Sequence, residues 1–455
     1  MSVSDTIGSG YPRRMRTADV PLPPSDRRNR IARLAQSGQL AMTFGLLAFG
    51  AASYVFLAAS GRALGPARFA SVSVLWAVLY LVGGGLFVPL EQELGRSVAA
   101  RRATGLGYGA LVRKVARIGC SAFVVVAIGL AMARGIVADE LFRGDDQFVV
   151  LLGVGIAGVG LMFFVRGLLA GADRYHGFGA LFLADSLTKS IPAIGLALAG
   201  VTNPLAYGLV LAASSFVGAL VPMTRGAQLG EPGPEPPSRA LVTSLGFLLL
   251  TSFLSAVVVN IGTIAVEVLA TPSERDEAGV FLSGLVIARI PLFLFQAVQA
   301  VVLPRLSGFA ASGQMAEFRR TLRMLAAGLA GATVVATSAS ALLGPFFVAA
   351  LFGESFDLLG ARDMAMLTLA SMLVMCALTV NQAQIALHHQ RQTGWPWAVA
   401  CTAFVVVTAI SSPDLFLRVE LGMVASGSAA TILGVLLLRP ALRNPDEHRE
   451  QTPAL

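Results

Sequence analysis

Four residues within long apolar runs could do chemistry. Arg289 lies near the middle of one run and is followed by Pro291, while Asp185 and Lys189 share a second run and Arg166 lies in a third. A guanidinium or ammonium group in a hydrated cavity binds phosphate or diphosphate, and arginine does so bidentately. Within a bilayer each charge costs at least about 2.5 kcal/mol, so it needs a partner or a wet cavity. Arg289, Lys189 and Arg166 are therefore candidate anion-binding residues, and proline two residues after Arg289 breaks the helix beside it.

The pair Asp185 and Lys189 admits two interpretations. Residues four apart face the same side of a helix, with the acid in the favourable amino-terminal position. In the first interpretation the two charges neutralise each other so that the segment can be embedded. In the second, Asp185 takes up a proton and frees Lys189 for an anionic ligand. Arg166 has a structural alternative as well, because it lies about two turns from a helix end and its side chain could extend to the interface.

Glu91 and Glu93 follow Pro89 near Arg96, at the end of another apolar run. A carboxylate pair at a helix end can close a passage by pairing with basic residues. Arg305 is the candidate partner because it occupies the repeat-equivalent position to Arg96. The alternative is that both acids are solvated helix ends. Glu91, Glu93, Arg305 and Asp185 are thus candidate gating or coupling residues.

The elements that must position these residues follow from the composition. Of 455 residues 55% are hydrophobic and only 13% are charged, and the mean hydropathy is +0.72. A water-soluble enzyme of this length needs far more polar surface, and 3 cysteines without a glycine period exclude disulfide-scaffold and collagen-like proteins. The chain is predicted to be an all-α integral membrane protein.

About twelve apolar segments are long enough to cross a bilayer. They are expected near 38–61, 70–94, 115–135, 147–172, 177–200, 204–224, 241–268, 278–303, 323–350, 360–387, 394–412 and 419–438. The predicted organisation is a flexible basic tail, a six-helix bundle, a linker, a second six-helix bundle and a tail. The corresponding boundaries are 1–37, 38–224, 225–240, 241–438 and 439–455.

The distribution of basic residues predicts the orientation. With the amino terminus inside, the Arg and Lys residues of the inner tails and loops outnumber those of the outer loops by about three to one. Both termini are therefore expected in the cytoplasm, in a multi-pass protein of the cytoplasmic (inner) membrane. The net charge of +8 is then explained by topology and contact with anionic lipid, and no nucleic-acid partner is expected.

Three weak internal similarities recur at nearly one spacing. The segment 93-ELGRS-97 aligns with 302-VLPRL-306, 141-LFRGD-145 with 351-LFGES-355, and Arg174 with Arg391. An even number of spans in each repeat makes the repeats parallel, related by an axis along the membrane normal with a cavity between them. We expect two pseudo-symmetric six-helix bundles.

Four stretches carry a resemblance to a known family. They are 61-GRALGPARFA-70, 166-RGLLAGADRY-175, 279-GVFLSGLVIARIPLFLFQAVQAVVLPRLS-307 and 351-LFGESF-356. In these the chain resembles the multidrug/oligosaccharidyl-lipid/polysaccharide (MOP) flippase superfamily over roughly 38–438, with the polysaccharide transporters, which include O-antigen flippases, as the most similar branch. It departs from many relatives in the seventh span, where Asn260 is followed at 262 by glycine in place of an acid.

The resemblance implies a V-shaped transporter of two bundles that works by alternating access. Its cargo would be a polyprenyl-diphosphate-linked oligosaccharide, moved to the outer leaflet for cell-surface polysaccharide (lipopolysaccharide) synthesis. Polysaccharide polymerases and glycosyltransferases are then possible partners beside membrane lipids. In this interpretation Arg289, with Lys189 and Arg166, holds the diphosphate.

Two alternatives remain open. One is an ion-coupled multidrug exporter of the same superfamily, although basic residues in the lumen would repel cationic drugs. The other is an integral-membrane, polyprenyl-dependent glycosyltransferase or ligase. An outer cluster of acids is its best support: Asp139, Glu140, Asp145 and Asp146. The outer loops are short for a sugar site, and a non-enzyme is the preferred prediction.

No motif predicts a cofactor or a metal. The glycines of 105-GLGYG-109 lack the Gly-Lys-Ser/Thr ending of a phosphate loop. His388 and His389 are adjacent, which does not give the spacing of a helical metal site. The three cysteines, in or beside apolar spans, read as packing residues.

Overall fold

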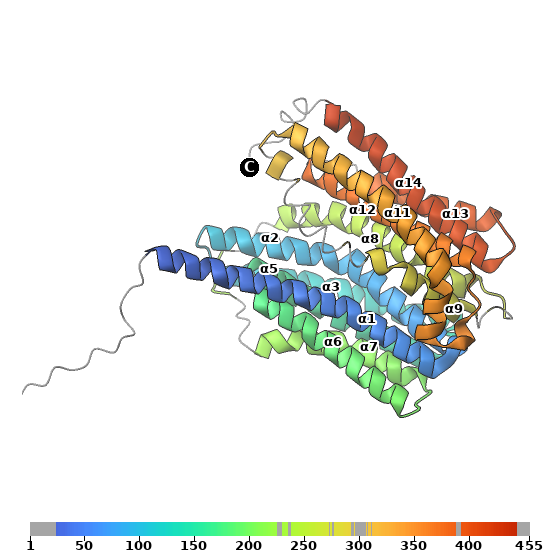
Figure 1. Ribbon diagram of the computed structural model, residues 1–455. Coiled ribbons are helices and arrows are strands. Elements are labelled where there is room, and N and C mark those ends of the chain that lie inside the picture. The colour runs from blue at the N-terminus through green and yellow to red at the C-terminus, as the bar shows by residue number, and fades with distance from the viewer. Residues whose placement is uncertain are drawn as a thin grey trace, which may run out of the picture.

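The described part of the chain is helical throughout and contains no strand (Figure 1). The computed structural model describes residues 24–224, 230–234, 238–272, 274, 277–292, 295, 306, 308–310, 312–387 and 393–443. Nine of the described helices are long and apolar enough to cross a membrane, and two shorter apolar helices accompany them. The longest stretch, Leu40–Ala103, is long enough for two crossings, so the described helices match the expected twelve spans.

The first half of the chain contains seven α-helices. They are α1 (Pro24–Val82), α2 (Val88–Ala103), α3 (Gly109–Met132), α4 (Arg134–Phe142), α5 (Asp146–Gly171), α6 (Tyr175–Leu198) and α7 (Pro204–Thr224), with a π-helical turn, Gly83–Phe87, between α1 and α2. A run of three glycines in that turn and Pro89 in the first turn of α2 explain why the regular helix is interrupted there.

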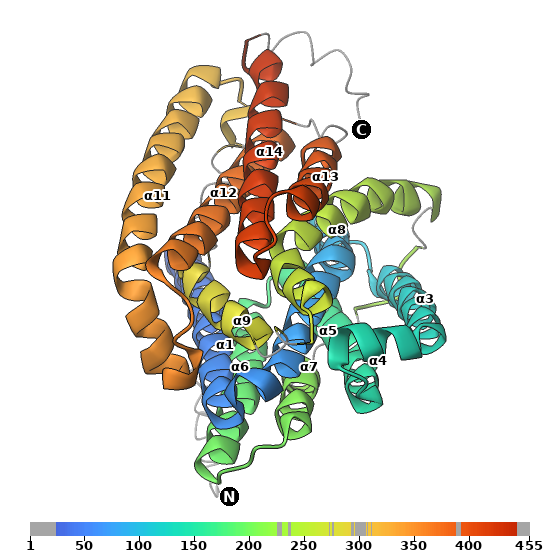
Figure 2. The same cartoon turned by 90° about the vertical axis from the view of Figure 1, so that its right-hand side faces the viewer.

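The second half contains six described α-helices. They are α8 (Ser238–Leu269), α9 (Glu277–Ala288), α11 (Met315–Phe352), α12 (Ala361–Ala386), α13 (Gly394–Ile410) and α14 (Leu415–Arg443), with a short 3₁₀ turn, Glu354–Phe356, after α11. Figure 2 shows α11–α14 gathered on one side and α1, α6 and α7 on the other, with α8 and α9 between them.

Equivalent helices pack in the same pairs in the two halves. In the first half the amino-terminal part of α1 contacts α6, α6 and α5 contact α7, and α2 contacts α5. In the second half α8 contacts α13, α13 and α12 contact α14, and α9 contacts α12. The recurrence of these pairs in chain order supports the expected parallel repeat of six spans.

Gly65 turns the chain sharply within α1. Its φ of 71° lies in the left-handed region that glycine adopts without strain, and Pro66 follows without a backbone N–H. The outer loop expected between 61 and 70 is therefore a kink in a helix. The turn brings Phe69 back toward the second half of the chain, where it packs against Phe352 and Phe356.

A small-residue motif determines how α5 meets α2. Gly167 and Gly171 are four residues apart on α5, and a Cβ at either position would lie within 2.7 Å of a backbone oxygen, that of Glu91 or Gly95 respectively. Only glycine permits this approach, as in other close pairs of membrane helices. The contact sets α2 beside α5 and brings Glu91 to the neighbouring Arg166.

The two halves are packed together at the end of the molecule remote from the termini. There Gly279 of α9 lies directly on Pro66, where a Cβ would overlap the proline carbonyl, and the three phenylalanines meet across the halves. The first turn of α1 and the last turn of α14 lie at the opposite end, toward which the ribbons of the halves diverge (Figure 1). The two ends of the chain thus lie on one side, as the charge pattern predicts.

Two predicted boundaries are wrong. Residues 24–37 were expected in a flexible tail, but α1 begins at Pro24. The last span was expected to end at 438, but α14 continues to Arg443. In both cases hydrogen bonds carry the helix past the end of the apolar run, since polar residues also sustain a helix where it leaves the apolar layer. The outer segment after the third span also contains a separate short helix, α4.

Candidate functional site

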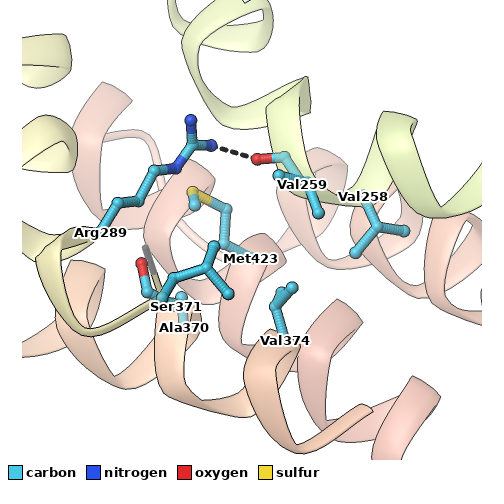
Figure 3. Close-up of a pocket in the computed structure, with 8 residues that line it drawn as sticks. Val258, Val259, Arg289, Ala370, Ser371, Val374 and Met423 are labelled. Carbon is cyan, nitrogen blue, oxygen red and sulfur yellow. Dashed lines mark hydrogen bonds between the residues drawn. The ribbon is translucent and has the colours of Figure 1, made fainter. Parts of the chain in front are cut away.

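Arg289 lies at the carboxyl end of α9, where the regular helix gives way before Pro291. Its side chain is 4% exposed and donates a hydrogen bond to the carbonyl of Val259 on α8 (Figure 3). Among the described residues no carboxylate pairs with it. The guanidinium faces a small cavity with room for about one water molecule, whose other lining residues are Val258, Val259, Leu292, Ala370, Ser371, Val374 and Met423. The bond to this carbonyl uses one of the five N–H donors of the guanidinium, so most of the donors remain for a ligand in the cavity.

A second, tighter cavity places Arg289 at the junction of the halves. It is lined by Arg289 and Val286 of α9 and by α1 residues of the first half: Ser53, Tyr54, Leu57 and Trp76. Both cavities are smaller than the usual pocket for a drug-sized ligand. The wide lumen expected around Arg289 is therefore closed in this conformation, because apolar side chains of both halves pack around α9.

Asp185 and Lys189 form a fully buried ion pair on α6, with Nζ 2.9 Å from Oδ2. Lys189 Nζ also lies 4.3 Å from the centre of the Phe49 ring. The other carboxylate oxygen, Oδ1, is buried without a hydrogen-bond partner. Gly218 of α7 leaves room for the aspartate, since a Cβ there would lie 2.9 Å from Asp185 Cβ. The expected i,i+4 pair is thus present, and one acceptor remains open for a proton or a donor.

Arg166 pairs with Glu91 across α5 and α2 at 3.1 Å, and both side chains are largely buried. Its guanidinium lies over three aromatic rings, those of Phe163, Phe178 and Phe182, at 4.4–5.7 Å from their centres. This aromatic enclosure holds the arginine inside the first half, so its side chain does not extend to the interface. The alternative in which Arg166 extends to the interface is therefore wrong, and its role in anion binding stays a proposal.

Tyr80 connects the charged groups of the first half. Its hydroxyl lies 3.1 Å from Ser53 Oγ, and its ring packs on Trp76 with centres 4.4 Å apart. It lies within electrostatic range of Lys189, and Tyr54 within range of Arg289. Because Ser53 lines the second cavity together with Tyr54 and Arg289, its hydrogen bond joins Tyr80 to the wall of that cavity.

Glu93 is not paired across the halves. It accepts two hydrogen bonds from Arg96, at 2.7 and 3.1 Å, and one from Ser97, all on α2. Together with the pair of Glu91 and Arg166, this gives both candidate gating acids partners in their own half. Arg305 lies outside the described residues.

A different ion pair joins the halves at the end remote from the termini. Arg143, which ends α4, donates to both carboxylate oxygens of Glu267 on α8, at 2.7 and 3.2 Å, and to the carbonyl of Ala67 beside the kink. The Glu267 side chain is only 2% exposed. The sequence gives a detectable signal for Glu267, which is an acid at the end of an apolar span.

The remaining signals have structural explanations in the described residues. Asp145 caps α5 by accepting from the Gln147 N–H, and Asp146 pairs with Arg134 at 2.8 Å. The 105–109 segment contacts the linker, because the Gly109 N–H donates to the Glu231 carbonyl. No metal-binding cluster of histidine, cysteine and acids occurs in the part of the chain that the structure describes. His388 and His389 lie outside the described residues.

One buried acid in the second half was also missed. Glu420, on α14, is 0% exposed, and neither carboxylate oxygen has a hydrogen-bond partner. The sequence could have indicated this residue, because Glu420 is a charged residue within the twelfth apolar segment, 419–438.

The chain is similar in sequence to two uncharacterized proteins of Mycobacterium tuberculosis. One is 24% identical over 380 residues, covering 79% of this chain and 82% of the relative. The other is 25% identical over 400 residues, covering 84% and 85%. No family model matches the chain.

Solved structures of similar fold are MATE transporters. An inward-facing multidrug resistance MATE family transporter of the MOP superfamily matches with a TM-score of 0.66 at 16% identity, covering 88% of this chain and 96% of that one. A mutant of the Vibrio cholerae MATE transporter VcmN gives 0.63 at 14%, covering 90% and 98%. An outward-facing MOP-superfamily MATE transporter gives 0.60 at 15%, covering 91% and 97%. The fold expected from the MOP resemblance is confirmed.

Proposed function

We propose that the protein is an alternating-access transporter that moves a polyprenyl-diphosphate-linked oligosaccharide across the cytoplasmic membrane for cell-surface polysaccharide synthesis. The observation that carries this proposal is Arg289, a buried cation at the junction of two pseudo-symmetric halves that has a cavity on each side and no carboxylate partner among the described residues. A diphosphate is the ligand chemistry that supplies both the missing charge and several acceptors.

The packing of the halves supports a state that is closed at the end remote from the termini. The halves are joined at the end remote from the termini by Arg143 and Glu267, and diverge toward the end that holds the termini (Figure 1). With cytoplasmic termini, as the basic residues favour, cargo would enter from the inner leaflet. The two cavities beside Arg289 have room for at most a water molecule, so binding of an oligosaccharide requires the halves to separate around α9.

In this mechanism Arg289 holds the diphosphate while the polyprenyl chain remains in lipid. Lys189 joins it when Asp185 accepts a proton or when the anion competes for the ammonium group. Arg166 and Glu91 fix α5 to α2, and a role for Arg166 in cargo binding would require this pair to open. Polymerases and glycosyltransferases that act on the same lipid carrier are the partners that this role implies.

A second candidate is an ion-coupled multidrug exporter, favoured by the multidrug resistance transporters among the structures of similar fold. The charges distinguish the two. A cationic drug near Arg289 would meet a like charge without a neutralising carboxylate, whereas an anionic lipid would meet a complementary one.

Reconstitution into liposomes separates these candidates. We expect the protein to transfer a fluorescent polyprenyl-diphosphate oligosaccharide between leaflets, and Arg289→Ala to reduce transfer at least tenfold while the exposed-residue control Arg62→Ala does not. The exporter would be established instead if the wild type transferred no lipid and if both the wild type and Arg289→Ala transported a cationic dye at the same rate.

A further inference from the structure

Glu420 is a buried carboxyl group without a neutralising partner. Its side chain lies within α14 at 0% exposure, and both of its oxygens lack a hydrogen-bond donor. An ionised carboxylate in this situation would cost several kcal/mol, because burial removes hydration that nothing replaces. Some positive charge must therefore accompany this group.

The packing of α14 on α12 shows which way Glu420 faces. Gly427 and Gly434 of α14 pack on α12, where a Cβ at either would lie 2.8 or 3.0 Å from Leu373 or Val380. Glu420 precedes Gly427 by the same seven residues, so it lies on the same face of the helix. Continuing the register places it against the first turns of α12, near Asp363.

The charged groups around Glu420 do not neutralise it. On α12, Asp363 adds a like charge, and Arg362 is committed to Asp363 at 2.6 Å with its side chain 57% exposed. The other acid close enough to act on it is Asp414, just before α14. Of the remaining helices packed on α14, α8 carries Glu267, and the titratable residue of α13 is the thiol of Cys401.

Comparison with Glu267 shows what Glu420 lacks. That acid is equally buried at the same end of the second half, yet it has the bidentate partner Arg143 and is thereby compensated. Glu420 has no equivalent cation. A metal ion needs several oxygen ligands, and no group of three or more His, Cys, Asp or Glu residues in the described part of the chain could hold one. A proton needs only the carboxylate itself.

We propose that Glu420 is a proton-binding site of the second half, occupied in the conformation described here. The carboxylate takes one proton from solvent to give a neutral carboxylic acid, and releases it when α14 and α12 separate enough to hydrate the group. Loss of the proton from the packed state leaves an unbalanced negative charge beside Asp363 and loosens the contact of α12 with α14. The site is independent of the cargo assigned above.

Infrared spectroscopy of the purified full-length protein in nanodiscs tests this site directly. We expect a carboxylic-acid C=O band at neutral pH that is absent in Glu420→Gln and retained in the matched exposed-residue control Glu354→Gln. We also expect the melting temperature of the wild type to fall as the pH rises, and that of Glu420→Gln to change less. An unchanged band in Glu420→Gln would overturn the proposal.

A second variant keeps the test decisive if Glu420→Gln does not fold. Asp363→Asn retains the oxygen that accepts from the Gly360 N–H at 2.8 Å but removes the neighbouring charge and releases Arg362. Both changes favour the ionised Glu420, so the band should disappear at a pH about one unit lower than in the wild type. Proton binding would be refuted if the carboxylic-acid band of Asp363→Asn titrated at the same pH as that of the wild type. It would also be refuted if sodium raised the melting temperature at constant pH and the pH itself had no effect. Neither readout uses cargo, so failure here leaves the transport proposal standing.

Discussion

Glu267→Gln should open the end of the molecule that is remote from the termini. The substitution removes the bidentate carboxylate contact of Glu267 from Arg143, whose side chain is 21% exposed. Removing one member of a fully buried pair costs about 3–5 kcal/mol, and the partial exposure of the arginine reduces this to about 2 kcal/mol. Since about 1.4 kcal/mol corresponds to a factor of ten, the ratio of outward-open to outward-closed molecules should rise about thirtyfold.

Distances between spin labels measure this ratio. Labels at Glu140 and Leu358, both exposed and on opposite halves at that end, report its opening once the native cysteines are replaced. We expect a longer distance population in Glu267→Gln and a wild-type distribution in the control Glu354→Gln. Exchanging the charges, with Arg143→Glu and Glu267→Arg together, should restore much of the closed population. A wild-type distribution in Glu267→Gln would refute the assignment of this pair as an outer closure.

Three further predictions follow from the same contacts. Gly279→Val should weaken closure of the same end, because the Cβ of the valine would overlap the Pro66 carbonyl, and the spin labels should then show a population at longer distance. An unchanged distance distribution would mean that the contact is not needed for closure. Asp185→Asn should leave Lys189 without its anionic partner and make lipid transfer less dependent on pH; transfer as pH-dependent as in the wild type would count against titration of Asp185. Glu91→Gln should lower the melting temperature by several degrees, since it leaves the buried Arg166 unpaired, and the double variant with Arg166→Met should recover part of the loss; equal losses would mean that the pair is not coupled.

The sequence was sufficient for the architecture because hydrophobic length and charge asymmetry are local properties. The twelve spans and the arrangement in two repeats follow from runs of apolar residues and from the side on which arginines gather. The ends of α1 and α14 were not predictable in this way, since helices continue beyond the apolar layer into polar sequence.

Ion pairs within one helix could be predicted from the sequence, whereas ion pairs between helices could not. Asp185 and Lys189 could be paired in advance because both lie on one helix at i,i+4. Glu91 and Arg166 could not, because their pairing depends on the close approach of α2 to α5 at Gly167 and Gly171. The same applies to Arg143 and Glu267, which are 124 residues apart and meet only when the halves pack together.

Binding of a polyprenyl diphosphate to the purified protein is the most direct test of the diphosphate assignment to Arg289. We expect Arg289→Ala to weaken binding by about ten- to hundredfold, the value of a charge-assisted hydrogen-bonded contact, Arg289→Lys to weaken it less, and Arg62→Ala to leave it unchanged. Equal affinity of the wild type and Arg289→Ala would contradict the assignment of this residue to an anionic cargo.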